Sequence, residues 1–200
     1  MIRLLEKYQG IIFDLDGTLI DTMPHHLDTW RTTAEAFHFP YDRQWLHDLG
    51  GMPGEGIVDL INDRYNLNLD NVEVSEFRIS VFNSLAERGD PISCTNEILN
   101  HFFGQKKLAV GTGSSRLSAL EQLERTGIYP KLDSVVTAND VEKHKPNPDT
   151  FLLAANEMAI DPKLCVVFED TALGKLAAHR AKMDCIMLEG EQLNFYPCSM

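Results

Sequence analysis

The sequence has no long apolar run, few cysteines and a shortage of basic residues. Its apolar stretches extend over only a few positions, which excludes a helix that spans a membrane. Residues 1–10 have no apolar core, so we expect no signal peptide there. The four cysteines show no Cys-x-x-Cys spacing, and Cys165 and Cys185 lie in apolar runs as core side chains do. We therefore expect a cytoplasmic, monomeric protein without a membrane partner.

The charge balance is strongly acidic. Lys and Arg number 18 against 30 Asp and Glu, which gives a formal net charge of −12. No long-range positive field attracts a phosphate backbone, so nucleic acid is excluded as an expected partner. The hydrophobic fraction of 44% and the charged fraction of 24% are those of a globular protein rather than a disordered or fibrous one. Two hundred residues exceed the usual single-domain length by about a third, which favours one domain with a large insertion.

Short apolar runs without alternation recur along the chain. They are typical of strands that are buried on both faces of a parallel sheet, and we predict strands at residues 9–13, 108–111, 134–137, 165–168 and 185–188. Helical patterns follow most of them. One begins with Ser114 or Ser115 as its cap and places Leu117, Leu120 and Leu123 on one face. Another begins at Asn147 and Pro148. Strands that alternate with helices predict an α/β fold with a doubly wound parallel sheet.

Residues 23–88 interrupt this alternation. Leu27, Trp30, Ala34 and Phe37 recur at helical spacing, and so do the apolar residues between 77 and 85. A glycine-rich turn at residues 50–56 separates the two patterns. We predict a core of residues 1–22 and 89–200 and a small helical cap of residues 23–88, inserted after the first strand and hinged near Thr22 and Gly89.

Polar side chains follow four of the predicted strands. In a parallel sheet the carboxyl ends of the strands meet at one edge, where ligands bind. The sequence delivers a set of groups to this edge: Asp14 and Asp16, then Thr112, Gly113 and Ser114, then Lys145, then Glu169 and Asp170. Each group alone also has a structural interpretation, as a turn, a helix cap, a surface lysine or an acidic helix start. Their order and placement together favour a phosphate ester held by a divalent metal.

The chemistry assigns a task to each group. A carboxylate nucleophile such as Asp14 can form an aspartyl-phosphate, while Asp16 protonates the leaving oxygen and later activates water. A phosphate dianion about 4 Å from an ionised aspartate is repelled by roughly 8 kcal/mol at an effective dielectric constant of about 20. Mg²⁺ on Asp14 and Asp170, with Glu169 acting through water, can offset this repulsion together with Lys145. The amides of Gly113 and Ser114 add donors.

These residues resemble the four motifs of the haloacid dehalogenase-like phosphohydrolase superfamily, over nearly the whole chain. The resemblance is narrowest to the β-phosphoglucomutase-type subgroup and, within it, to bacterial fructose-1-phosphate phosphatases. Its carriers are DLDGT, Asp21 and Thr22 followed by His26, and the segments AVGTGS, KHKPNPDTFLLAA and CVVFEDTALG. It implies a Rossmann-like core, a cap that closes over the substrate, Mg²⁺ as cofactor, and a metal ligand in the backbone carbonyl of Asp16. It also implies that Thr112 binds phosphate through its hydroxyl.

Two residues of the predicted cap, and one position at which this chain differs from mutases of the family, bear on the choice of substrate. His26 matches a histidine that contacts the acid/base aspartate in mutases; its alternative is an exposed helix residue. Arg78 lies near a cap position where relatives carry a basic residue, which implies that it binds the substrate. The alternative is that Arg78 is a solvated charge on a helix surface. Relatives that act as mutases hold a second phosphate with a cap-loop arginine, where this chain has Gly54. Hydrolysis of a small sugar phosphate, with fructose 1-phosphate first, is therefore favoured over the mutase alternative. A signalling receiver domain and an inactive binding protein fit the chain less well.

Overall fold

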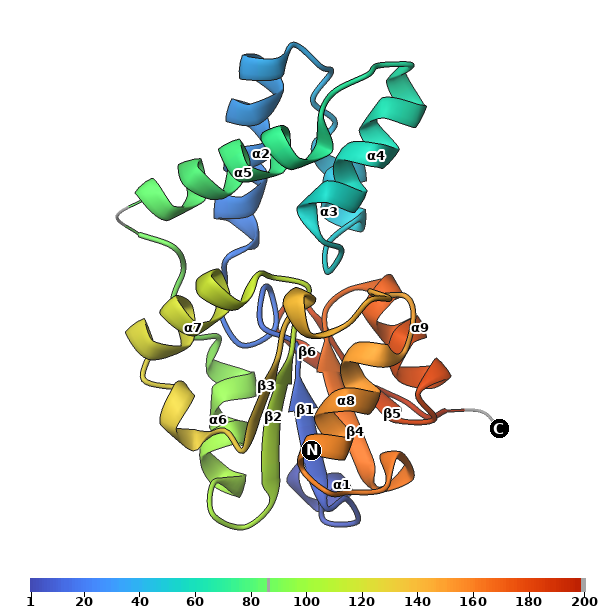
Figure 1. Ribbon diagram of the computed structural model, residues 1–200. Helices are drawn as coiled ribbons and strands as arrows, with labels where there is room; N and C mark the ends of the chain where they lie inside the picture. Colours follow the sequence, from blue (N-terminus) through green and yellow to red (C-terminus); the bar gives the residue numbers. More distant parts are fainter. Residues whose placement is uncertain (86, 199–200) are drawn as a thin grey trace.

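The computed structural model describes residues 1–85 and 87–198 of the chain. Helices and strands alternate along most of it, as Figure 1 shows. The helices are α1 (Ile2–Leu5), α2 (Met23–Phe37), α3 (Arg43–Asp48), α4 (Gly54–Tyr65), α5 (Asn71–Ser84), α6 (Ser93–Phe102), α7 (Arg116–Arg125), α8 (Asp149–Glu157) and α9 (Ala172–Arg180). Short 3₁₀ turns are η1 (Tyr129–Lys131), η2 (Ala138–Asp140) and η3 (Pro162–Leu164). The strands are β1 (Gly10–Phe13), β2 (Lys107–Gly111), β3 (Ser134–Val136), β4 (Cys165–Glu169), β5 (Asp184–Glu189) and β6 (Gln192–Tyr196).

The strands form one sheet in the order β3-β2-β1-β4-β5-β6. The first five are parallel, and β6 pairs with β5 in the antiparallel direction. The prediction of a doubly wound α/β fold is confirmed, and the five predicted strands lie within one or two residues of the observed ones. The edge strand β6 was not predicted, because its side chains are mostly half-buried and give no continuous apolar run.

Two layers of helices cover the sheet. Alternate residues of β1 point to opposite faces, with Ile11 and Phe13 on one face and Ile12 on the other. On the first face these side chains pack against α6 and α7, and on the second against α8 and α9 (Figure 1). Because both faces of the sheet are covered, the central strands β1 and β4 consist of buried residues. This explains why their sequences lack polar alternation.

The helix predicted after the second strand is α7. Ser115 is its N-cap and accepts a hydrogen bond from the backbone N–H of Ser118. The predicted apolar face is wrong at Leu117, which is 71% exposed, whereas Leu123 is fully buried. Ser118, Ala119 and Gln122 are buried with Leu123. The face that α7 turns toward the core therefore differs from the one that the leucine spacing predicts. No helix in the described ranges is long and apolar enough to cross a membrane.

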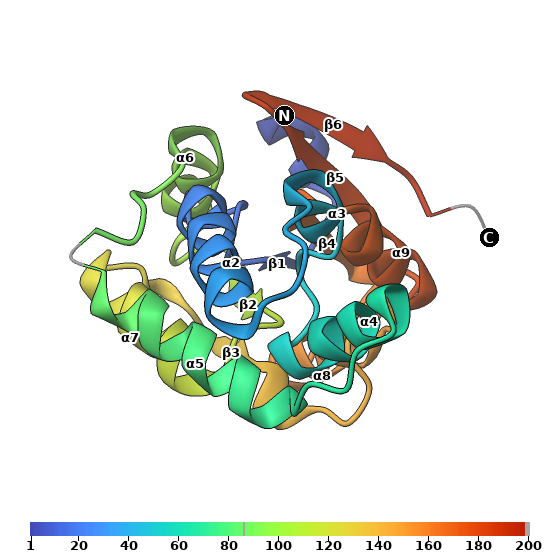
Figure 2. The same ribbon diagram turned by 90° about the horizontal axis from the view of Figure 1, so that it is seen from above.

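Helices α2 to α5 form a separate layer beyond the carboxyl ends of the strands, as Figure 2 shows from above. They share their own hydrophobic cluster, which includes Leu27, Trp30, Val58 and Ile61, and its members come from residues 27–74. The chain enters this layer after Asp21 and leaves it before Asp90, whose carbonyl oxygen accepts a hydrogen bond of 2.9 Å from the Asp21 N–H. The two connections thus lie side by side.

Candidate active site

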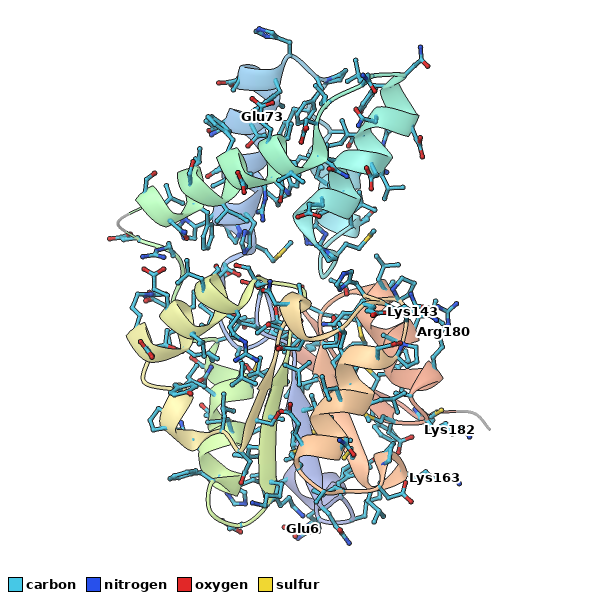
Figure 3. All side chains as sticks on the ribbon, viewed as in Figure 1. Glu6, Glu73, Lys143, Lys163, Arg180 and Lys182 are labelled. Carbon is cyan, nitrogen blue, oxygen red and sulfur yellow. The ribbon has the colours of Figure 1, made fainter. Side chains whose placement is uncertain are left out.

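The motif residues of four strand ends lie together where the core faces the helical layer. Asp14 follows β1 directly, and its N–H donates to the carbonyl oxygen of Phe168 on β4 at 2.9 Å, which continues the parallel pairing. The same pairing aligns the end of β1 with Glu169, the last residue of β4, and with Asp170 after it. Figure 3 shows Lys143, two residues before Lys145, at the end of the core that faces the helices. The sheet register therefore sets the spacing of the site.

Lys145 is the centre of a buried ion triad. Its side chain is 1% exposed, and its Nζ donates to Asp14 Oδ1 at 2.6 Å and to Glu169 Oε1 at 2.7 Å. Burial by itself lowers the pKa of the Lys145 ammonium, but the two carboxylates outweigh it and raise this pKa. Burial raises the pKa of Asp14, Glu169 and Asp16 add to this effect, and Lys145 opposes it. Lys145 therefore offsets part of the cost of ionising Asp14, whose pKa nevertheless rises to about 7.

Glu169 and Asp170 complete the acidic cluster. Oε2 of Glu169 accepts hydrogen bonds from the N–H and the hydroxyl of Thr171 at 2.8 and 2.9 Å. With Lys145 on Oε1, both oxygens of this carboxylate already have partners. Asp170 Oδ1 accepts from the hydroxyl of Thr18 at 3.1 Å. One carboxylate oxygen each of Asp14, Glu169 and Asp170 lies within 4.8 Å of the others.

This cluster has the electrostatics of a cation site. Burial raises the pKa of Asp170 well above its ordinary range, and the charges of Glu169 and Asp14 raise it further. A single lysine cannot neutralise three buried carboxyl groups, so a divalent cation with hard oxygen preferences fits the donor set. The acidic cluster could hold a metal ion, with Asp14 and Asp170 offering the oxygens that fewer protein donors occupy.

Asp16 is held by hydrogen bonds on both oxygens. Oδ1 accepts from the Thr22 hydroxyl at 2.7 Å and lies 3.0 Å from His26 Nε2, while Oδ2 accepts from the Ser114 hydroxyl at 2.6 Å. Burial acts to raise the pKa of Asp16, but His26 and the hydroxyl donors outweigh burial and lower it below its usual range. Sequence reasoning identified Ser114 only through its amide. The structure adds its hydroxyl and Thr22, both of which stand next to motif residues.

His26 and Arg78 lie inside the site rather than on an exposed helix face. His26 Nδ1 is 3.2 Å from a terminal nitrogen of Arg78, and its ring stacks on Phe82 with centroids 4.3 Å apart. Because Arg78 can only donate, Nδ1 accepts and Nε2 carries the proton that faces Asp16. The guanidinium also lies 5.1 Å from the ring centroid of Trp30. Burial lowers the pKa of Arg78 to about 10, against the opposing charge of Asp16, so it remains cationic.

The loop after β2 forms the opposite wall. The Thr112 hydroxyl accepts a hydrogen bond of 3.0 Å from the Ser114 N–H, at the start of α7. Gly113 lies directly under the glycine-rich turn of the helical layer, and a Cβ added there would collide with the carbonyl oxygen of Gly51. Thr112, Gly113 and Ser114 all line the cavity.

A cavity of about 330 Å³ lies between the core and the helical layer. Its core wall carries Asp14, Asp16 and the loop after β2, and its outer wall carries His26 and Arg78. Residues that sequence reasoning did not single out also line it: Trp30, Met52, Ser75, Phe82, Asn139 and His144. Three of them, Trp30, Ser75 and Phe82, lie on α2 or α5, where spacing marks a helix face but not what the face binds.

Comparisons with known proteins agree with this geometry. Residues 11–188 match the family model of the haloacid dehalogenase-like hydrolases. The fructose-1-phosphate phosphatase YqaB of Escherichia coli (strain K12) is 36% identical over 184 residues, which cover 92% of this chain and 97% of the relative. A phosphorylated carbohydrates phosphatase of Thermotoga maritima is 29% identical over 183 residues, 89% of this chain and 83% of the relative.

The fold itself also has solved counterparts. A β-phosphoglucomutase of Clostridium difficile superposes with a TM-score of 0.80 at 23% identity, covering 92% of this chain and 85% of the mutase. At that identity the likeness shows a shared architecture. The family match, in contrast, spans the first strand, all four strand ends and the inserted helices. The chain therefore belongs to the haloacid dehalogenase-like hydrolase family.

Proposed function

We propose that the protein is a Mg²⁺-dependent phosphatase that hydrolyses a small sugar phosphate, with fructose 1-phosphate as the best candidate substrate. The observation that carries the proposal is the placement of Asp14. Its carboxylate is held by Lys145 at 2.6 Å and lines the same cavity as Asp16. The relatives that are named as sugar phosphate phosphatases support the substrate class.

The reaction follows from two carboxyl groups with separate tasks. A carboxylate oxygen of Asp14 attacks phosphorus and the bond to the sugar oxygen breaks, while Asp16 gives a proton to that oxygen. Asp16 is ionised in the resting site, where hydrogen-bond donors lower its pKa, so in this proposal the charge of the bound phosphate ester raises that pKa and Asp16 is protonated before the step. Asp16 then takes a proton from water as the water oxygen attacks phosphorus. This second step releases inorganic phosphate and regenerates Asp14. Thr112 and the amides of Gly113 and Ser114 bind the phosphoryl oxygens in both steps.

The acidic cluster supports Mg²⁺ as the cofactor. We assign Asp14, Asp170 and the backbone carbonyl of Asp16 as its ligands, with Glu169 in an outer position, because both Glu169 oxygens already have hydrogen-bond partners. When bound, the ion neutralises charge on the phosphoryl group. The ammonium group of Lys145 supports the same task, because its charge favours the ionised form of Asp14 against the effect of burial.

The helical layer supports the assignment of residues 23–88 as a cap over a core of residues 1–22 and 89–200. It has its own hydrophobic cluster and supplies one wall of the cavity. In this proposal His26 and Arg78 bind the sugar portion of the substrate, which selects among phosphate esters. A monomeric state and a cytoplasmic location remain predictions.

The proposal is tested with purified protein and a panel of phosphorylated hexoses, pentoses and nucleotides. We expect phosphate release that requires Mg²⁺, is greatest for a sugar monophosphate, and stops on addition of EDTA. Asp14→Asn should abolish turnover with an unchanged circular dichroism spectrum, whereas Asp63→Asn, an exposed change on the cap, should not. An active Asp14→Asn variant would overturn the mechanism. An isomerised product from a sugar bisphosphate would favour the mutase alternative instead.

A further inference from the structure

Gln122 is a buried polar residue that directly contacts the acid/base carboxyl group but does not line the cavity. It lies on α7 with a fully buried side chain, and its Nε2 donates to Asp16 Oδ1 at 3.4 Å. Its Oε1 is buried and has no hydrogen-bond partner in residues 1–85 and 87–198. Its neighbour Ser118, one turn earlier on the helix, does line the cavity.

The amide is unfavourable for stability at this position. A buried carbonyl oxygen without a donor carries an uncompensated desolvation cost, and one hydrogen bond of 3.4 Å does not offset it. The flanking positions of the buried face are Ala119 and Leu123, which pack in the core. An apolar side chain would therefore suit the packing better. Within the described part of the chain, the one hydrogen bond of the Gln122 side chain is the one to Asp16.

The origin of each donor to Asp16 shows what this contact adds. Oδ1 accepts from Thr22, at the entrance to the helical layer, and His26, on α2 of that layer. Oδ2 accepts from Ser114 of the core. Gln122 adds a donor to Oδ1 from α7 of the core, apart from the hinge residue Thr22. With Ser114, it restrains both oxygens independently of the position of the cap.

The helix that carries Gln122 is itself fixed near both ends. Arg116 binds Asp140 through two hydrogen bonds of 2.7 and 2.8 Å at its start. Near its end, Glu121 binds Arg88 at 2.7 Å, and Arg125 donates to the carbonyl oxygen of Gly89. A side chain on such an element provides a rigid restraint, as a positioning group requires.

We propose that Gln122 is a positioning residue that orients Asp16 for proton delivery to the leaving oxygen of the substrate. This inference rests on the proposed phosphatase function. It assigns Gln122 no contact with substrate or metal, so the residue acts through Asp16 alone. The contribution is then confined to esters whose leaving oxygen must be protonated as the bond to phosphorus breaks.

The test compares two leaving groups in two variants. Gln122→Met keeps the length and shape of the side chain but removes the donor, and Gln122→Glu replaces the donor with an acceptor. Because kcat/KM covers substrate binding and phosphoenzyme formation, it includes protonation of the leaving group and excludes the later attack of water. The comparison of the two leaving groups then separates protonation from binding. For fructose 1-phosphate, or the best alkyl phosphate of the panel, we expect kcat/KM to fall on the order of tenfold, a part of the roughly 10²–10⁴ that acid–base catalysis supplies.

For 4-nitrophenyl phosphate, whose phenolate leaves without a proton, we expect a change below about twofold. Gln105→Met serves as the control. Gln105 is exposed, and its side chain donates to the His101 carbonyl oxygen at the end of α6. The thermal midpoint of Gln122→Met should equal or exceed that of the wild type, because the unpaired carbonyl is removed. Lost stability would therefore not explain lost activity.

Equal losses for both esters, or no loss for the alkyl ester, would overturn the inference. Gln122→Glu preserves the shape of the side chain, so it decides the question if Gln122→Met does not fold. If the wild type hydrolyses neither ester in the presence of Mg²⁺, the proposed function itself fails. A wild type that is active on both esters and matched by Gln122→Met would remove only the role of Gln122.

Discussion

Replacing Lys145 with methionine tests the electrostatics of the site most directly. The variant leaves the buried carboxylates of Asp14 and Glu169 without their shared cation. Their oxygens lie within 4.8 Å of each other, and two unit charges at that distance repel by about 3.5 kcal/mol at an effective dielectric constant of about 20. Breaking a buried ion pair costs about 3–5 kcal/mol, so the two arguments agree on the expected loss of unfolding free energy.

The loss of stability in Lys145→Met should depend on pH. Burial and the charge of Glu169 raise the folded-state pKa of Asp14 to about 7, above the unfolded value of about 4, and the loss of Lys145 removes the charge that opposes this shift. The loss of unfolding free energy from ionising this buried group is therefore absent below about pH 4. It grows as the pH rises through the folded-state pKa. Urea denaturation in EDTA should show a larger deficit for Lys145→Met at pH 8 than at pH 5.5. Mg²⁺ should reduce this deficit, because a cation replaces the lost charge.

Two further variants control the comparison. Adding Glu169→Gln to Lys145→Met removes one of the two charges and should recover much of the loss. Lys107→Met breaks the ion pair with Asp133, in which the lysine is 55% exposed, and should cost less than about 1 kcal/mol at either pH. A deficit for Lys145→Met that does not vary with pH, or that matches the Lys107 control, would refute the reasoning.

Two predictions concern the walls of the cavity. Arg78→Met removes the guanidinium, and we expect steady-state kinetics to show a KM for the sugar phosphate raised by about 10- to 100-fold, the cost of about 1.5–3 kcal/mol for a hydrogen bond to a charged group. An unchanged KM would contradict this. Gly113→Ala introduces a Cβ against the Gly51 carbonyl oxygen, so the phosphate loop and the cap loop must separate. We expect kcat to fall with little change in thermal midpoint, whereas Gly104→Ala, in open space, should leave kcat unchanged.

The core was predictable because its signals are local. A strand buried on both faces must be apolar throughout, and the residue that follows it lies at the edge where ligands bind. Asp14 and Thr112 each follow a strand directly and Glu169 ends one, so the order of the strands brings them together. Lys145 is farther from its strand. The loop of residues 141–148 brings it into contact with Asp14. The strand order predicted that Lys145 reaches this edge of the sheet, but not that its ammonium group pairs with both Asp14 and Glu169.

The supporting residues of the site were less predictable. Gln122 and Thr22 belong to a helix face and a hinge, and their importance depends on which atoms they meet in space. The inward face of α7 was misjudged at Leu117 for the same reason. Leucine spacing reports where apolar residues stand, whereas the helix is rotated so that a serine and a glutamine face Asp16 and the cavity. Hydrophobic periodicity cannot detect a buried polar side chain.

The geometry around Gly54 changes the argument about mutase chemistry. The glycine was read as the loss of an arginine that holds a second phosphate, yet Arg78 supplies a guanidinium to the same cavity from α5. A Cβ at position 54 would collide with the Ser75 hydroxyl, and it would lie 3.7 Å from Arg78 Nε. A side chain at position 54 therefore requires the Ser75 hydroxyl to rotate away. The cap is not without a cation, and the missing loop arginine alone does not exclude a bisphosphate.

The surroundings of Arg78 limit what that cation can hold. One terminal nitrogen already donates to His26, and burial lowers the pKa of the guanidinium to about 10, so it carries a full charge at neutral pH but fewer free donors. A phosphate dianion there needs a bidentate partner and additional donors, whereas apolar residues such as Trp30, Ile57 and Phe82 form much of that wall. A neutral hydroxyl of a sugar needs only one donor and packs against such a wall. Because Arg78 has few free hydrogen-bond donors, the cavity favours a sugar monophosphate over a bisphosphate. This in turn favours hydrolysis over the transfer of a phosphoryl group by a mutase.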